Sequence, residues 1–484
     1  MLHLPGLLAI VALPVAMLAG EWFAVPGFVA LAVAAPLLGQ LAMRKAGSPG
    51  PTKPIDALAS VALGWLLCAA LAAVPLFAAA ELGGTRSGAA GVYGQPVHAL
   101  FEGMSGITST GLTMVGQEGA LPMSIQWWRT LLQWVGGVGV IVVIAGAVER
   151  LEGARALYEA EARERVFRED IRQTARGIWI LFCALSVVSV LALLAAGAEP
   201  WVALNHGMTG IATGGFVVTD QSFVEEPATV KIVALAVMIV GAVSFVHLHR
   251  VVVERNWRTL VRSTQTRALA IGLVASVGAT IAATEAGPED PGLLDAVFQG
   301  VSALATCGFA SESPGGWGPA ALMVLSTAMI VGGSAGSTTG GLKLARAAWL
   351  VKAAISQVSN GMRPIGGRAR VSFDGEEVSE HDAASAIGHA AGLAVLWLST
   401  LGAATLALVL LLPDSSAGEI AFEAASALGS VGLTTGITGP SLPLAPELIL
   451  IVLMWLGRLE IVAVIVVLLV PFVAGRRRRA ESRR

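Results

Sequence analysis

The sequence predicts an all-α integral membrane protein. Its expected architecture is four repeats of a long helix, a short re-entrant helix and a second long helix, preceded by an N-terminal two-helix hairpin. Three observations carry this prediction. The 484 residues are 55% hydrophobic and only 13% charged, with a mean hydropathy of +0.74, which excludes an ordinary soluble domain. Apolar runs of membrane-spanning length recur along the chain, and one twelve-residue phrase occurs four times.

The apolar runs predict ten membrane spans. They occupy residues 4–19, 23–42, 57–80, 125–148, 178–196, 230–246, 268–283, 317–351, 391–412 and 448–473. Glycines interrupt the run at 317–351. The first run could instead be a cleaved signal peptide because it ends in small residues. No basic segment precedes it, however, and a second run follows at once, which favours a helical hairpin.

The repeated phrase stands at residues 102–113, 206–217, 299–310 and 423–434. Each copy has a hydroxyl residue, then Ile or Leu two positions later, Ser or Thr four later and Gly six later. Repetition at intervals of about a hundred residues indicates four copies of one structural unit. Each copy is expected to form a short helix that enters the membrane, ends in a Ser/Thr-Gly loop and returns, because it is too short to cross.

Basic residues cluster at 44–53, 150–176, 250–267, 343–370 and 476–484, each cluster an even number of spans from the last. Outside these clusters we place Arg86, Arg129 and Lys231, on the side that also carries most loop acids. The positive-inside rule therefore predicts a multi-pass protein of the bacterial inner membrane with both termini cytoplasmic.

These features divide the chain into six parts. They are a hairpin (1–54), repeat 1 (55–174), repeat 2 (175–264), repeat 3 with a broken second helix (265–382), repeat 4 (383–475) and a basic cytoplasmic tail (476–484). The linker at 149–176 alternates acids and bases, so it is either a solvated helix or a docking surface.

Four loops around one axis predict a pseudo-four-fold pore whose backbone carbonyls replace the water around a dehydrated alkali cation. Glycine permits the positive φ that turns carbonyls inward, and the carbonyl ends of the short helices favour a cation. For one phrase alone, packing of small residues would be the simpler interpretation, but four aligned copies disfavour it. The predicted ion-binding residues are Ser109, Thr110, Gly111, Thr213, Gly214, Gly215, Thr306, Cys307, Gly308, Ser430, Val431 and Gly432.

A glycine- and hydroxyl-rich stretch interrupts the second span of repeat 3 and would unwind a helix just below these loops. We interpret it as a gate made of Gly332, Gly333, Ser334, Ala335, Gly336, Ser337, Thr338, Thr339, Gly340 and Gly341. The stretch also matches the G-x-S-x-G elbow of serine hydrolases. That elbow needs a preceding strand, so an intramembrane hydrolase using Ser334 is the disfavoured alternative.

Arg458 lies within the last apolar run, and an ionisable residue at membrane depth is a functional-site hypothesis. We expect it to contact the 332–341 segment and to place a positive barrier below the loops. A structural ion pair is the alternative, with Glu460 as a possible partner, although residues two apart do not face each other on a helix. The glycine-rich stretch 133–139 lacks a preceding strand, so we interpret it as a helix-packing surface.

Together, the four phrases and residues 128–139, 332–341 and 457–461 resemble the Trk/Ktr family of potassium uptake proteins, and the chain looks like a TrkH-like pore subunit. The resemblance covers essentially the whole chain, although the fourth phrase is more similar to the Ktr branch. It implies a non-enzymatic, channel-like K⁺ uptake protein, with the glycines of the phrases in a selectivity filter, 332–341 as gate and Arg458 beside it.

The resemblance also implies a homodimer and a cytosolic nucleotide-binding regulatory subunit of TrkA type. No cofactor is expected besides the transported K⁺, and Cys68, Cys183 and Cys307 are too scattered for a metal site. The residues before the four glycines all differ, so a Na⁺-selective or H⁺/Na⁺-coupled symporter remains an alternative. A third alternative is a non-conducting receptor or scaffold.

Overall fold

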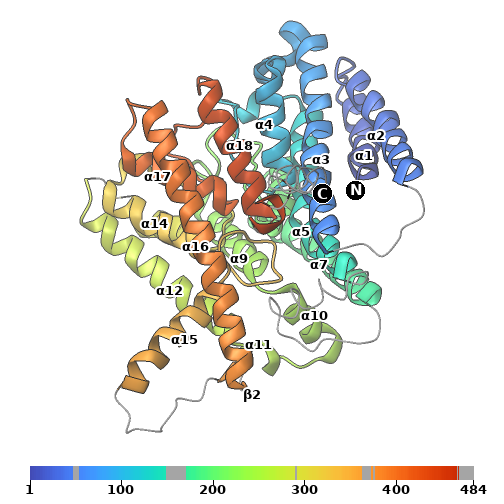
Figure 1. The fold of residues 1–484 in the computed structure, drawn as a ribbon. Helices are drawn as coiled ribbons and strands as arrows, with labels where there is room; N and C mark the ends of the chain where they lie inside the picture. The colour runs from blue at the N-terminus through green and yellow to red at the C-terminus, as the bar shows by residue number, and fades with distance from the viewer. Residues whose placement is uncertain are drawn as a thin grey trace, which may run out of the picture.

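The structure is a computed structural model that describes residues 1–46, 54–148, 171–288, 291–361, 372–373, 376–459, 461–465 and 467. The described chain is a bundle of helices with one small two-stranded ribbon (Figure 1). Most of the predicted 149–176 linker, Glu460 and the basic tail at 476–484 lie outside the described residues.

The N-terminal helices α1 (His3–Leu18) and α2 (Val25–Ala46) form a hairpin beside α3 (Pro54–Gly83), seen in dark blue in Figure 1. Glycines allow the close approach. A Cβ on Gly6 would press on Pro36 of the partner helix, and one on Gly27 would press on Pro75 of α3. The predicted hairpin is therefore present and packs directly on the first unit of the bundle.

Four units follow, and each places a short helix between longer ones. The first contains α3, η1 (Gly84–Gly94), α4 (Pro96–Ile107), η2 (Glu118–Ala120) and α5 (Met123–Val148). The second contains α7 (Ile171–Ala195), α8 (Pro200–Ile211), α9 (Ala228–Ala242), α10 (Phe245–Glu254) and α11 (Arg258–Arg262). The third contains α12 (Thr264–Glu285), α13 (Leu293–Leu304), η3 (Pro314–Gly316), α14 (Pro319–Val331), α15 (Leu344–Gly361), β1 (Ser372–Phe373) and β2 (Glu376–Glu377). The fourth contains α16 (Glu380–Leu411), α17 (Ala417–Gly429) and α18 (Leu444–Arg458).

Of the four short helices, α4, α8 and α17 begin at recognisable sequence signals. Pro96 and Pro200 occupy the first turn of α4 and α8, where proline costs no hydrogen bond. A capping box starts α17: the Ser416 hydroxyl accepts from the Glu419 N–H, and the Glu419 carboxylate accepts from the Ser416 N–H. These signals favour the observed starts of α4, α8 and α17, whereas α13 begins after Gly292 without a side-chain cap.

The second helix of each unit differs from unit to unit. The prediction of one continuous span at 230–246 is wrong, because α9 ends at Ala242 and the chain bends by 96° into α10. The Phe245 N–H at this bend donates to the Gly336 carbonyl oxygen at 2.9 Å, so a neighbouring unit supplies a partner. In the third unit the helix is interrupted between Val331 and Leu344, and in the fourth α18 ends at Arg458 inside an apolar run.

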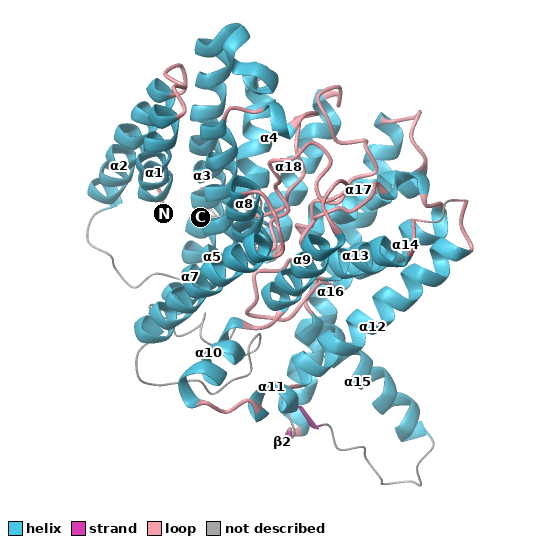
Figure 2. Cartoon of the chain, turned by 180° about the vertical axis from the view of Figure 1, so that it is seen from behind, coloured by secondary structure: helices cyan, strands magenta, loops and turns pink. Residues whose placement is uncertain are grey.

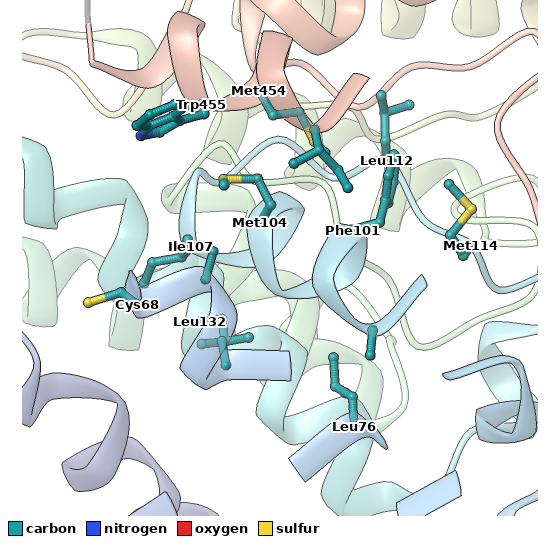
Figure 3. Packing of buried hydrophobic residues seen from close by; sticks show 14 of the residues in the cluster. Cys68, Leu76, Phe101, Met104, Ile107, Leu112, Met114, Leu132, Met454 and Trp455 are labelled. Atoms are coloured by element: carbon teal, nitrogen blue, oxygen red, sulfur yellow. The ribbon is translucent and has the colours of Figure 1, made fainter. Parts of the chain in front are cut away.

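The core around α4 is shown in Figure 3, where Phe101, Met104 and Ile107 point toward neighbouring helices. Met454 and Trp455 approach from α18, so the first and last units share one core. The Trp455 indole N–H donates to the Ala62 carbonyl oxygen at 3.0 Å, and Trp128 donates similarly to Ala72. Because each indole N–H has a backbone carbonyl as its acceptor, these large side chains are buried without an unsatisfied donor.

The outer surface of the bundle is apolar. Ile271, Val274 and Leu410 expose 70%, 76% and 75% of their surface. Soluble proteins rarely expose large apolar patches to water. By length and composition, five helices can cross a bilayer, within 25–45, 58–94, 175–195, 264–285 and 380–411. The bent pair α9 and α10 makes a sixth if it counts as one span, within the described part of the chain. The protein is therefore an integral membrane protein.

Candidate functional site

The four phrases end their short helices in the same way. In the first, the Thr110 N–H donates to Ser105 O at 2.9 Å and the Ser109 N–H donates to Gly106 O at 3.0 Å, which is a Schellman motif. The other three copies repeat both bonds. The pairs are Gly214 to Thr209 with Thr213 to Gly210, Cys307 to Ser302 with Thr306 to Ala303, and Val431 to Ser426 with Ser430 to Ala427.

The same phrases share an unusual backbone. Ser109, Thr213, Thr306 and Ser430 all adopt positive φ, between 46° and 56°, a conformation that costs a residue with a Cβ about 1–2 kcal/mol. Two residues later the glycines also have positive φ: Gly111 99°, Gly215 80°, Gly308 85° and Gly432 101°. Repetition of this strained pattern in four copies makes the loops the candidate functional site.

The four loops contact one another in a closed ring. Each glycine lies so close to the next loop that a Cβ would overlap a backbone carbonyl oxygen. The four overlaps are Gly111 on Gly214, Gly215 on Cys307, Gly308 on Val431 and Gly432 on Thr110. Figure 2 shows these loop segments gathered in the centre, between α8, α9, α13, α17 and α18. The ring order is therefore unit 1, 2, 3, 4 and back to unit 1.

The hydroxyls of the predicted ion-binding residues mostly form hydrogen bonds to other protein groups. Ser109 donates to Ala212 O at 3.1 Å, which ties unit 1 to unit 2. Thr213 bonds the Thr338 hydroxyl at 3.1 Å, and Thr306 accepts from the Gly340 N–H at 2.7 Å. Ser430 is the exception, with no partner for its hydroxyl among the described residues. If the predicted residues bind an ion, backbone carbonyls are therefore its main ligands.

Two residues of α5 that were not predicted as site residues hold the second loop. The Gln133 amide N–H donates to the Gly214 carbonyl, and its oxygen accepts from the Phe216 N–H at 2.9 Å. Arg129, one helical turn earlier, donates to Val217 O at 3.1 Å and is 1% exposed. Sequence reasoning placed Arg129 on the outer side only, although a lone cation inside an apolar run was a signal for a buried role.

The glycine-rich part of α5 packs on two of the loops. A Cβ on Gly136 would overlap the Ile107 carbonyl oxygen, and one on Gly137 would lie against Ala212. Both contacted residues precede a predicted ion-binding loop by one or two positions. The helix-packing interpretation of 133–139 agrees with this geometry.

The 332–341 segment lies directly against the loops of units 2, 3 and 4. Besides the bonds to Thr213 and Thr306, its Gly341 N–H donates to Gly429 O at 3.0 Å. The Thr338 hydroxyl lies 3.1 Å from the carbonyl oxygens of Ile211 and Gly241. A Cβ on Gly340 would overlap Gly429 O, so no larger residue fits there without a shift. The segment therefore closes against the ends of the short helices.

Arg458 joins three units through carbonyl oxygens. It donates to Thr338 O at 3.0 Å and to both Gly136 O and Gly137 O at 2.7 Å. The contact that we predicted between Arg458 and the 332–341 segment is therefore present. Its side chain is 6% exposed, and Glu460, the proposed alternative partner, lies outside the described residues. The guanidinium cross-links the segment to α5.

The structure does not support a nucleophile elbow at Ser334. The residues before it form α14, not a strand, and its N–H donates to Ala242 O at 3.1 Å. The described residues contain no group of three or more His, Cys, Asp or Glu side chains that could hold a metal ion.

Comparison with known proteins places these features in a family. The family model for TrkH, described as a cation transport protein, matches residues 79–275 and 288–472. A Trk system potassium uptake protein TrkH of Halomonas elongata is 30% identical over 431 residues, which cover 85% of this chain and 84% of the relative. An uncharacterised cation transporter of Methanocaldococcus jannaschii is 29% identical over 453 residues, or 93% and 87% of the two chains.

A solved structure has the same fold. The crystal structure of the potassium transporter TrkH from Vibrio parahaemolyticus matches with a TM-score of 0.80 and 22% identity, over 97% of both chains. The matching family comprises cation transporters rather than enzymes, so the hydrolase interpretation of Ser334 is wrong. With more than half of its residues covered by the family model, the chain belongs to the TrkH family of cation transport proteins.

Proposed function

We propose that this protein is the potassium-translocating subunit of a channel-like K⁺ uptake system. The observation that carries the proposal is the closed ring of four glycine loops, each with the same positive-φ backbone. Stripping water from a small cation costs on the order of tens of kcal/mol, so several oxygens must replace it together. Carbonyls from four strained loops can do this without a fixed charge that would trap the ion.

In this proposal the twelve predicted residues from Ser109 to Gly432 form a selectivity filter on the pore axis. The carbonyl ends of the four short helices, which lead directly into the loops, would then stabilise a cation beside them. The segment 332–341 acts as the intramembrane gate, and Arg458 holds it closed. Hydrogen bonds support this role: the Thr213 hydroxyl donates to Thr338 of the segment, and the Gly340 N–H of the segment donates to Thr306, so the segment lies against the filter and must move to open a path.

We further propose that the protein works as a homodimer in the bacterial inner membrane, with both termini cytoplasmic. A TrkA-like nucleotide-binding subunit would bind the cytoplasmic face and move the gate. The relatives named after a Trk system support a multi-component assembly.

Purified protein in liposomes, with and without a TrkA-like partner, tests the function through uptake of ⁸⁶Rb⁺ as a K⁺ surrogate. We expect ⁸⁶Rb⁺ uptake that excess K⁺ inhibits strongly and excess Na⁺ inhibits far less. Absence of Rb⁺ and K⁺ flux in the presence of the partner would contradict the proposal.

A coupled or Na⁺-selective symporter is the second candidate, because Thr110, Gly214, Cys307 and Val431 make the ring chemically uneven. Measuring the same flux with Na⁺ in place of K⁺, and with an imposed proton gradient, separates the two. Flux that stops without the gradient would identify a coupled transporter.

A further inference from the structure

We propose that the first residue of each phrase is a positioning residue that holds the return limb of its filter loop. The four residues are Glu102, His206, Gln299 and Glu423, and the return limbs are 112–115, 216–219, 309–312 and 433–438. We further propose that the two carboxylates set selectivity for K⁺ over Na⁺. The inference rests on the proposed function and deepens it, because it names residues behind the filter that the ion does not touch.

All four residues are buried, with 0% or 1% of their surface exposed, and each bonds to the limb of its own loop. Glu102 accepts from the Thr113 hydroxyl at 2.9 and 3.0 Å and from the Met114 N–H at 3.2 Å. This recurrence at one phrase position is independent of the hydroxyls and glycines that define the filter.

We call the bonds between the first residue of a phrase and its return limb a brace. In unit 1 the brace extends to unit 2. Arg129 donates to Glu102 at 2.7 Å and to Val217 O, in the limb of unit 2, at 3.1 Å. The guanidinium also stacks 4.1 Å from the centre of the Phe216 ring. The other hydrogen-bonding groups of this buried ion pair are largely used as well. Such a pair fixes the position of one limb relative to the other. One carboxylate therefore holds two limbs.

In unit 4 Glu423 performs the same task with hydroxyls and amides. It accepts from the Thr435 N–H at 2.9 Å, the Thr438 hydroxyl at 2.9 Å and the Thr434 hydroxyl. No basic side chain pairs with Glu423 within the described ranges. An ionised carboxylate has about four acceptor sites and can satisfy all of these donors together.

Units 2 and 3 have weaker braces. His206 accepts only from the Val218 N–H at 3.1 Å, and Gln299 donates only to Glu312 O at 2.7 Å. The second polar atom of each side chain has no partner among the described residues. Two well-held limbs thus adjoin each other, since unit 4 contacts unit 1 in the ring.

Limb position matters because selectivity depends on where the filter carbonyls stand and how firmly they are held. The limb begins directly after the filter glycine, so loosening it frees the carbonyls of the loop. A smaller ion can then pull the oxygens inward, and discrimination against Na⁺ falls while conduction continues.

The test is the K⁺ to Na⁺ permeability ratio from bi-ionic reversal potentials in proteoliposomes. We expect Glu423→Ala to lower the ratio roughly tenfold, as loss of hydrogen bonds to a charged group would, with ⁸⁶Rb⁺ flux retained. Gln299→Ala, which loses one bond, should lower it less. Glu419→Gln is the matched control, because Glu419 lies on the same helix but is only half-buried, and glutamine also fits a capping box.

An unchanged ratio in Glu423→Ala overturns the inference and leaves the proposed function standing, whereas a wild-type protein without K⁺ flux overturns the function. If Glu423→Ala does not purify as a single species, the near-isosteric Thr438→Val decides. It removes one donor to Glu423, so a fall of roughly twofold or more supports the brace, and a wild-type ratio refutes it.

Discussion

The filter loops and the second helices of the same four units follow opposite rules. In the loops, four segments with different side chains keep the same Schellman ending and the same two positive φ angles. In the second helices, α5 is continuous, α9 bends by 96° at its end, α14 stops at a glycine-rich segment and α18 ends at a buried arginine. The comparison teaches that symmetry is kept in the loops that we propose surround the ion and is lost in the second helices, where we propose that the path opens and closes.

The largest expected effect comes from breaking the symmetric part. A Cβ on Gly308 would overlap the Val431 carbonyl oxygen at a φ of +85°, so Gly308→Ala should strain the ring. We expect ⁸⁶Rb⁺ uptake to fall roughly a hundredfold, the factor given by a loss of about 3 kcal/mol. Gly392→Ala on α16, where a Cβ meets no neighbour, is the control and should retain uptake. Equal activity of the two variants would show that the ring is not the ion path.

The next effect comes from the asymmetric part. Arg458→Gln removes charge-assisted bonds to Thr338, Gly136 and Gly137, so the gate segment should be released. Flux without the partner should rise roughly tenfold, and Arg458→Lys should give an intermediate rise because it keeps the charge without the planar fork. Partner-free ⁸⁶Rb⁺ efflux measures both. If efflux and the response to the partner are identical to wild type, Arg458 does not hold the gate segment closed.

A smaller effect is expected where the two regions meet. Thr306→Val removes the acceptor of the Gly340 N–H, which should raise partner-free flux roughly threefold, as expected for one neutral hydrogen bond. Thr327→Val serves as the control, since the Thr327 hydroxyl is exposed and bonds only within α14. If both variants behave alike, the gate is not held by the filter.

The smallest effect concerns pH outside the filter. Burial raises the pKa of Glu118, in the segment after the first loop, to about 7. The carboxylate is therefore charged above pH 7 and neutral below it, so the nearby potential for cations weakens as pH falls. Because its unfolded pKa is lower, burying this charge costs stability above the unfolded pKa, and the cost is relieved as pH falls through 7.

We expect ⁸⁶Rb⁺ uptake to fall less than about twofold from pH 8 to pH 6, given screening by salt, and Glu118→Gln to flatten the profile. A steeper fall that survives Glu118→Gln would assign the pH dependence to another group.

The repeated half of the molecule could be predicted from sequence because its signals are local. A hydroxyl, an apolar residue, a second hydroxyl and a glycine at fixed spacing indicated all four short helices and their loops. The break at 332–341 was visible for the same reason, since many glycines cannot stay helical.

The asymmetric half could not be predicted as fully. Residues 232–243 are uniformly apolar and give no local sign of a helix end, whereas the bend into α10 has a hydrogen bond from Phe245 to Gly336 of another unit. The braces were also missed. Glu102 and Glu423 stand inside the phrase, but their partners are set by tertiary packing.

The central claim is that one ring of carbonyls from four loops binds the transported ion. The most direct measurement is a crystal structure of the protein grown in Rb⁺, with anomalous difference density used to locate the ion. The account predicts density on the axis enclosed by Gly111, Gly215, Gly308 and Gly432, within coordinating distance of backbone carbonyl oxygens. Rb⁺ bound elsewhere in the bundle, with that axis empty, would contradict it.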